Sequence, residues 1–227
     1  MGSKDKSIVI TGGGVIGSCI AYYLTSHPRY DRKSHTVTVL EASSIGGGAS
    51  GKAGGVIASW AYPSCLAPLS YRLHCELADK HGGIQKWGFR HVYCADVDAM
   101  GEAVGHAATT QDYAHFHSHI FSSRSNKQFP PELDWITPDK ITSYTELGRP
   151  ENTAQVHPHL FTNSIADAAI ENSARFITGY ATSLNQINNG GQIKSVSYEA
   201  KQTNELNEIN ATDVVIAAGP WTKNLLP

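Results

Sequence analysis

The spacing of apolar and polar residues predicts a strand, a helix and a second strand at the start of the chain. A short β-branched run at 7–11, ended by glycines, is typical of a buried strand. Over 15–26 apolar residues recur every fourth position, which indicates a helix, and Pro28 disfavours its continuation. A second strand follows at 35–41. Such a βαβ unit places its two strands parallel and adjacent.

The remainder of the chain predicts a mixture of elements. Helices are predicted at 68–80, near 98–110 and at 158–179, strands at 88–95 and 213–219, loops at 43–58 and 122–131, and a hairpin from 181–187 and 192–199 through Asn188–Gly191. The segment 97–150 is less regular, with proline breaks at 130–131 and 138. We place a second, smaller lobe there. There are no internal repeats.

The first motif with chemical meaning is Gly12-x-Gly14-x-x-Gly17, which directly follows the first strand and opens the first helix. In this context Gly12 allows a tight turn, Gly14 lets the backbone approach a pyrophosphate, and Gly17 lets the helix pack against the strand. A pyrophosphate would lie on free amides at the positive end of the helix dipole, near Val15 and Ile16. Without further support, a plain glycine turn explains the pattern equally well.

Glu41 supplies that support, because it closes the second strand 24 residues after Gly17. A carboxylate there can accept hydrogen bonds from both ribose hydroxyls of an adenosine, and it would repel a 2′-phosphate, which disfavours NADP. A lone Glu at a strand end is usually only solvated. The two features together predict a dinucleotide site that includes Ala42 next to the carboxylate.

A second glycine-rich segment favours FAD over NAD. Nine of the twelve residues at 45–56 are glycine, alanine or serine, among them Ala49, Ser50, Gly54 and Gly55. An amide-rich loop beyond the second strand can wrap the far side of a pyrophosphate and continue toward a flavin, whereas nicotinamide enzymes have no need of one. A surface linker is the alternative interpretation.

Composition and charge narrow the class of protein. The chain has 227 residues, 41% hydrophobic and 17% charged, with a net charge of −2 and a pI of about 6.6. These values are typical of a globular protein and provide no basic field for nucleic acid. The run at 8–10 is too short for a signal peptide or a membrane span, so we expect a cytoplasmic protein, with peripheral endomembrane association left open.

Three groups of residues invite other interpretations. The cysteines at 19, 65, 75 and 94 form no C-x-x-C pair, and we interpret them as reduced thiols rather than zinc ligands. A metal site at His115, His117 and His119 lacks a nearby Cys or acid, and a flavin tether at Cys65 is disfavoured. Tyr62, His74 and Arg90 are explained as ordinary surface or core residues, so no catalytic residue is assigned.

The order of these motifs resembles the D-amino-acid-oxidase superfamily of FAD enzymes, which includes glycine oxidases and glycerol-3-phosphate dehydrogenases, and within it the fungal members. The segment 155–160 resembles the family's valine–aspartate–proline entry into a helix, with His157 in place of the acid. The segment 213–222 resembles its alanine–glycine–proline–tryptophan strand end. The resemblance spans the whole chain.

The resemblance implies an α/β fold with a Rossmann-like FAD/NAD(P)-binding domain and an inserted α+β substrate domain of antiparallel strands. We expect FAD-binding segments at 1–85 and 155–227, with the first part of the substrate domain at 86–154. The expected cofactor-binding residues are Gly12, Gly14, Val15, Ile16, Gly17, Glu41, Ala42, Ala49, Ser50, Gly54, Gly55, Leu184, Ala218, Gly219 and Trp221. Family members are longer, so we also expect a missing C-terminal part that carries most of the substrate site.

The implied activity is an FAD-dependent oxidation of the C–N bond of an amino acid or secondary amine by hydride transfer to flavin. Two alternatives remain open: a non-catalytic FAD-binding protein with an interaction or trafficking role, and an NAD-dependent dehydrogenase. The substrate, the electron acceptor and the oligomeric state cannot be inferred from the sequence.

Overall fold

The computed structural model describes residues 5–101, 133, 135–187 and 192–225. The chain divides into two compact units, one formed by 1–91 with 152–227 and the other by 92–151. Assigning the first unit to cofactor binding and the second to substrate binding remains a prediction. In the second unit, strands β5 (Cys94–Ala99) and β6 (Ile141–Gly148) form an antiparallel pair. A short 3₁₀ turn, Pro138–Lys140, directly precedes β6.

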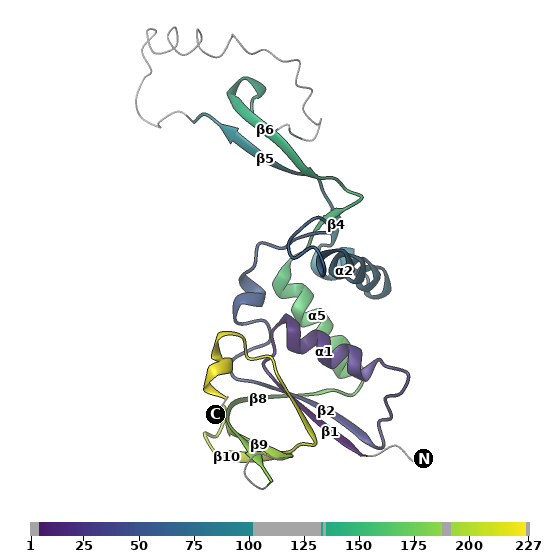
Figure 1. Cartoon of the computed structure of the whole chain (residues 1–227), viewed down its shortest axis with the longest axis vertical. Coiled ribbons are helices and arrows are strands. Elements are labelled where there is room, and N and C mark those ends of the chain that lie inside the picture. Colours follow the sequence, from purple (N-terminus) through teal and green to yellow (C-terminus); the bar gives the residue numbers. More distant parts are fainter. Residues whose placement is uncertain (1–4, 102–132, 134, 188–191, 226–227) are drawn as a thin grey trace. The chain divides into compact units, whose positions relative to one another are not determined.

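The first unit is built on a six-stranded sheet in the order β10-β9-β8-β2-β1-β11 (Figure 1). Its strands are β1 (Lys6–Thr11), β2 (His35–Glu41), β8 (Arg175–Gln186), β9 (Ile193–Ala200), β10 (Leu206–Asn210) and β11 (Asp213–Ile216). Strands β11, β1, β2 and the first residues of β8 are parallel, whereas β8, β9 and β10 form an antiparallel meander. The predicted βαβ unit is confirmed, with α1 at Val15–Thr25.

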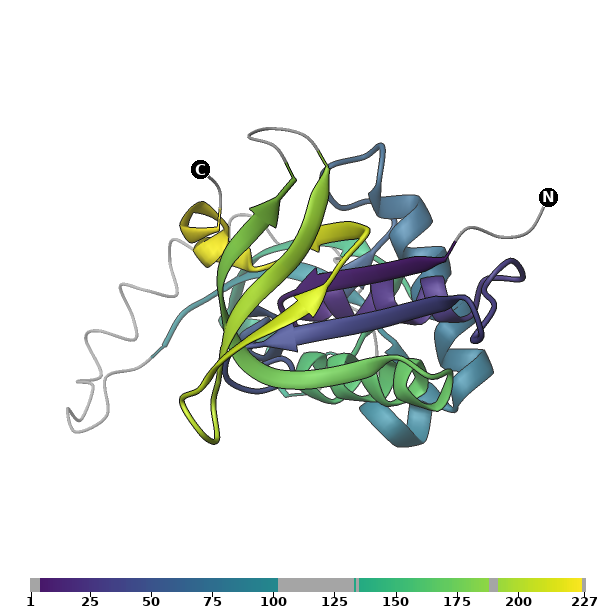
Figure 2. The same ribbon diagram turned by 90° about the horizontal axis from the view of Figure 1, so that it is seen from below.

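Alternation along the strands buries both faces of this sheet. Ile10, Val37 and Val39 belong to the core that packs against α1 and α5 (Pro158–Glu171), whereas Val9 and Leu40 point to the opposite face, where they pack with Val196 of the meander. Figure 2 shows the two helices on one side of β1 and β2 and the meander on the other. Because both faces are covered, β1 carries the apolar run 8–10, and β2 buries Thr38 together with its valines and Leu40.

The predicted helix at 158–179 is wrong in its second half. Helix α5 ends at Glu171, Ser173 adopts a positive φ of 79°, and β8 begins at Arg175. Ile177 was counted as helical because its spacing continues that of α5, but Phe176 and Ile177 pair in parallel with β2. Aromatic and β-branched side chains suit a pleated strand, and pairing with β2 decides the outcome.

Other segments differ from prediction in smaller ways. The loop expected at 43–58 contains a 3₁₀ turn, Ala49–Lys52, and strand β3 (Val56–Ala58). Helix α2 runs from Ala67 to His81 and is followed by the short helix α3 (Gly83–Trp87). The strand expected at 88–95 is divided into β4 (Arg90–His91) and the start of β5, and a further strand, β7, is Thr153–Gln155. Strands β3, β7 and β4 form a small antiparallel sheet. The predicted helix near 98–110 is contradicted at its start by β5, and its remainder, the loop at 122–131 and the connection at 188–191 lie outside the described residues.

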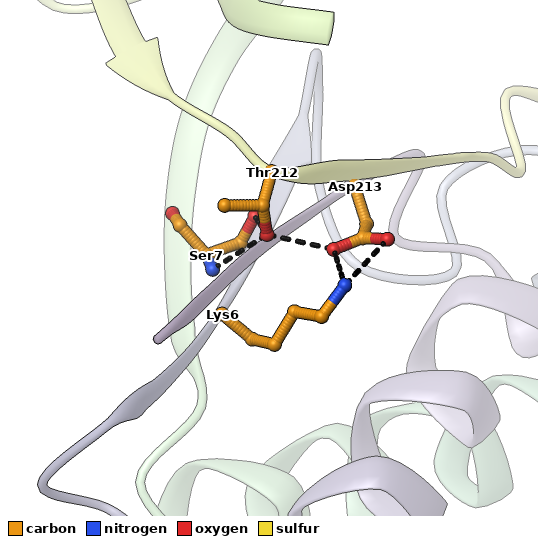
Figure 3. A network of polar contacts seen from close by, with 4 residues as sticks. All are labelled: Lys6, Ser7, Thr212 and Asp213. Carbon is orange, nitrogen blue, oxygen red and sulfur yellow. Dashed lines mark hydrogen bonds and ion pairs between the residues drawn. The ribbon is translucent and has the colours of Figure 1, made fainter. Parts of the chain in front are cut away.

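A polar network joins the start of β1 to the start of β11 (Figure 3). The Thr212 hydroxyl accepts a hydrogen bond from the Ser7 amide at 3.0 Å and donates to Asp213 Oδ2 at 2.7 Å. Lys6 Nζ forms an ion pair with the same carboxylate at 2.8 Å, although both side chains are nearly half exposed. The network therefore holds the two strands in register at the end of the sheet where the strands begin.

We expect Thr212→Val to lower the free energy of unfolding by about 1–2 kcal/mol, because the Ser7 amide loses its acceptor. Asp213→Asn should cost less than about 1 kcal/mol, since an exposed ion pair contributes little. Urea denaturation of each variant measures both values. The matched control is Thr36→Val on an exposed position of β2. Equal effects of the two threonine substitutions would show that the network does not stabilise the sheet.

Candidate functional site

The glycine turn between β1 and α1 is shaped by two close backbone approaches. Gly12 has a φ of 107°, its amide donates to the Leu40 carbonyl at 2.8 Å, and a Cβ on it would lie 2.3 Å from the Ala217 carbonyl oxygen. A Cβ on Gly17 would lie 1.9 Å from the Gly12 carbonyl oxygen. Any side chain at either position would push the helix or β11 away, so both glycines are required by packing.

The N-terminus of α1 keeps free amide donors. Gly14 is the residue before the helix, and a Cβ there would contact only the Ser50 side chain, with Oγ at 3.0 Å. The Val15 amide donates to Ser50 Oγ at 2.9 Å. Among the described residues, none accepts a hydrogen bond from the amides of Gly14 or Ile16, and the Ile16 side chain is 61% exposed. These donors, with the helix dipole, suit an anion.

The Glu41 carboxylate lies directly beside this turn. Its Oε2 accepts from the Gly13 amide at 2.7 Å, and its Oε1 accepts from the amide and hydroxyl of Ser43 at 2.7 and 2.9 Å. A carboxylate offers about four acceptor positions, so these three protein donors leave roughly one for a bound ligand. The sequence pattern identified Glu41 but not Gly13 or Ser43, because neither belongs to the recognised motif.

The second glycine segment folds back onto the first. Gly46, at a φ of 67°, donates from its amide to the Gly13 carbonyl at 3.0 Å, and Ser50 reaches Val15 as described above. Further on, a Cβ on Gly55 would lie 2.2 Å from the Val156 carbonyl, whereas one on Gly54 would meet no atom within 4 Å. The interpretation of this segment as a separate surface linker is therefore wrong for residues 46–50.

Gly54 borders a hollow of about 390 Å³. It is lined by Gly51, Lys52, Ala53, Gly54, Arg90, Gln155, Val156, His157 and Pro158. The side-chain amide of Gln155 donates to the Gly54 carbonyl at 2.8 Å, which holds the loop. The His157 ring accepts from the main-chain amide of Leu160 at 3.4 Å, which holds the start of α5. Lys52 and Arg90 are the charged residues of this lining, and both are cationic.

The strand end at 217–222 lies beside the glycine turn. The Ala217 amide donates to the Thr11 carbonyl at 2.8 Å, Ala218 precedes a 3₁₀ turn (Gly219–Asn224), and Gly219 has a φ of 55°. Trp221 is 56% exposed, and its Cζ3 lies 3.8 Å from the position that a Cβ on Gly48 would take. Segments more than 160 residues apart in sequence thus meet at the carboxyl ends of the parallel strands.

The remaining candidate residues are more separate. Ala42 is exposed just after β2. Leu184 pairs with Val196 in the meander and packs in its core, while the neighbouring Thr182 falls at a register shift of that ladder. Leu184 packs against a cluster that contains Val9 of β1 and Leu40 of β2, and its role toward the cofactor stays a prediction.

The residues that the sequence analysis interpreted as ordinary surface or core residues differ in burial and surroundings. Tyr62 is 95% exposed, and Arg90 lines the hollow. His74 packs on Phe161 with ring centroids 4.5 Å apart, and burial lowers its pKa to about 4. Its buried Nδ1 has no hydrogen-bond partner among the described residues. All four cysteines are free, and burial raises the pKa of the Cys19 thiol in α1 to about 11. The histidines at 115, 117 and 119 lie outside the described residues.

Comparison with solved structures supports the fold. Glycine oxidase from Bacillus cereus aligns with a TM-score of 0.66 at 20% identity, covering 98% of this chain and 57% of that one. L-proline dehydrogenase from P. horikoshii aligns with a TM-score of 0.64 at 20% identity, covering 98% and 55%. A glycerol-3-phosphate dehydrogenase from Bacillus halodurans, complexed with FAD, aligns with a TM-score of 0.57 at 14% identity, covering 97% and 36%. None of the described helices is both long and apolar enough to cross a membrane.

Comparison of sequences identifies the family. A protein of Schizosaccharomyces pombe named "Putative oxidoreductase C1F5.03c" is 30% identical over 99% of this chain, and "Putative oxidoreductase TDA3" of Saccharomyces cerevisiae is 26% identical over 97%. The matches cover 57% and 63% of these two relatives. The model of the DAO family, described as FAD dependent oxidoreductase, matches residues 7–227. The chain therefore belongs to the DAO family of FAD-dependent oxidoreductases, as its motifs had indicated.

Proposed function

We propose that this chain contributes the FAD-binding part, and the beginning of the substrate-binding part, of an enzyme that oxidises the C–N bond of an amino acid or secondary amine. One observation carries the proposal: both glycine segments, Glu41 and the strand end at 217–221 meet at the carboxyl ends of β1, β2 and β11. That edge of an open parallel sheet is where α/β folds bind nucleotides.

The residues present fit the dinucleotide half of FAD. Free amides at the start of α1 would hold the pyrophosphate, with Ser50 beside them, and the remaining acceptor position of Glu41 would hold the ribose. The Gly14 turn leaves room for a ligand, since a Cβ there would meet only the Ser50 side chain. The open face of Gly54 gives a flat backbone surface toward the hollow.

When FAD is bound, its flavin N5 would accept the hydride. The residues of this chain orient the cofactor and the substrate around it. An amine bound in its neutral form needs no strong base for hydride transfer. Lys52 and Arg90 give the hollow a positive potential that would favour an anionic group such as a carboxylate.

The choice of an amine substrate rests on the structural neighbours. Two of them are named as a glycine oxidase and an L-proline dehydrogenase, whereas the glycerol-3-phosphate dehydrogenase shows that the fold also serves an alcohol. The test is purification of the full-length protein, absorption spectroscopy at about 375 and 450 nm, and anaerobic bleaching with a panel of amino acids, N-methyl amines and hydroxy acids. Bleaching by hydroxy acids alone would overturn the amine assignment, and a colourless protein would overturn the role in FAD binding.

We expect Glu41→Gln to weaken FAD binding by about 10–100-fold, nearly as much as Glu41→Ala. Both carboxylate oxygens face main-chain N–H donors, from Gly13 and Ser43. Whichever way the amide of Gln turned, its NH₂ group would therefore face a donor. Titration of the apoprotein with FAD measures the dissociation constant. The matched control is Glu199→Gln, an exposed carboxylate on β9. An affinity of Glu41→Gln equal to that of wild type would show that Glu41 does not act as an acceptor.

A further inference from the structure

A series of hydrogen bonds connects Glu41, through Ser43, to Lys201 in the turn between β9 and β10. Ser43 donates twice to Glu41 Oε1, as described above, and its carbonyl accepts from Lys201 Nζ at 2.9 Å. The Lys201 amide donates to the Thr178 carbonyl at 3.2 Å. Thr178 is in turn the residue of β8 that lies opposite Glu41 in the parallel pairing of β2 with β8. Lys201 therefore contacts both the residue that donates to Glu41 and the residue that lies opposite Glu41 in the sheet.

We propose that Lys201 and Ser43 are positioning residues for Glu41, so that the β9–β10 turn sets the affinity for the adenosine half of the cofactor. This inference rests on the proposed function, which assigns Glu41 to the ribose. It adds two residues that no motif contains and a structural element outside the glycine segments.

The physical argument begins with the exposure of this region. Ser43 follows β2 in an exposed bend and belongs to no strand or helix itself. A free bend would let the Glu41 side chain sample several rotamers. Ligand binding would then be weakened by the conformational entropy lost when this side chain is ordered. The Lys201 contact holds the Ser43 carbonyl, which directs the Ser43 amide and hydroxyl toward Oε1. The carboxylate is thus oriented before a ligand arrives.

The contact between Lys201 and the Ser43 carbonyl also places a positive charge near Glu41. The ammonium of Lys201 lies 2.9 Å from the carbonyl of a residue that donates to the Glu41 carboxylate, so a positive charge is held near that negative one. Lys201 is exposed, and exposed charges interact only modestly. The expected effect of Lys201 is accordingly smaller than that of Glu41 itself.

The experiment measures ADP and FMN binding to the apo form of the full-length protein by calorimetry. Lys201→Met should weaken ADP binding about fivefold and Ser43→Ala about tenfold. FMN, which lacks the adenosine, should bind each variant as it binds wild type. Lys201→Arg should restore most of the ADP affinity, because its guanidinium can still donate to the Ser43 carbonyl. Lys194→Met, an exposed lysine on β9, is the control for loss of a surface charge.

A double-mutant cycle separates positioning from a general loss of structure. In the Glu41→Ala background, Lys201→Met should have no further effect on ADP affinity, because the group that it positions is gone. Additive losses, an equal loss for FMN, or an effect shared with Lys194→Met would overturn the inference while leaving the proposed function intact. Absence of ADP and FAD binding by wild type would overturn the proposed function and this inference with it.

Discussion

Gly17→Ala is expected to lower the free energy of unfolding by at least about 3 kcal/mol, and to prevent folding if the protein is less stable than that. The added Cβ would lie 1.9 Å from the Gly12 carbonyl oxygen and 3.3 Å from Ile10 Cγ2. The first of these neighbours is backbone, so it cannot rotate away as a flexible side chain would. Relief of the overlap requires α1 to move off β1, which separates the two elements that form the glycine turn.

Chemical denaturation followed by circular dichroism measures this loss. Gly54→Ala is the matched control, since its Cβ would meet no atom within 4 Å and its φ is not positive. That substitution should change stability by less than about 0.5 kcal/mol. If both substitutions had equally small effects, the close packing of α1 on the turn would be contradicted.

The second large effect is a loss of stability as the pH falls from 6.5 to about 4. Burial lowers the pKa of His74 to about 4 from an ordinary value of 6.5. The unfolded chain therefore takes up a proton at a higher pH than the folded chain does. Stability from neutral His74 is complete above pH 6.5, declines below it, and is lost once the pH passes through 4, by about 3 kcal/mol at most.

His74→Leu isolates this contribution, because it keeps an apolar side chain against Phe161 and removes the buried, unpartnered Nδ1. We expect the variant to be as stable as wild type at pH 7 or more so, and to lose less stability on acidification. Urea denaturation at pH 7, 5.5 and 4.5 gives the comparison. Burial also lowers the pKa of His81, so the difference between the two proteins is the informative quantity. Parallel pH profiles would contradict the assignment to His74.

Local sequence determined the parts of the fold that could be predicted. The strand at 35–41 was predicted to the residue, because valine, threonine and leucine are concentrated in it. The helix after the glycine turn was predicted to within one residue, because glycines precede it and Pro28 follows it. The boundary between α5 and β8 was missed because the apolar spacing runs on through it. Ser173 and the pairing of Phe176 with β2 end the helix there, and pairing is a tertiary interaction.

In the candidate site, too, residues of local motifs could be predicted and contacts between distant segments could not. Gly12, Gly17 and Glu41 follow from a local pattern, and the structure brings them together. The Lys201–Ser43 contact joins residues 158 positions apart and leaves no signal in either local segment. The cationic lining of the hollow likewise needs Lys52 and Arg90 from separate elements. Motifs therefore predict the glycine turn and Glu41, whereas the other groups of the proposed cofactor site depend on the folded arrangement.

The packing of Gly12 against Ala217 also bears on synthesis of the protein. Strand β1 leaves the ribosome well before its partner β11, which begins at Asp213. One wall of the glycine turn is thus missing until about 200 further residues have been translated. At about 5–20 residues per second, β1 waits roughly 10–40 seconds for this partner. During that interval the edge of β1 that later pairs with β11 stays open, and an open strand edge promotes pairing with other chains.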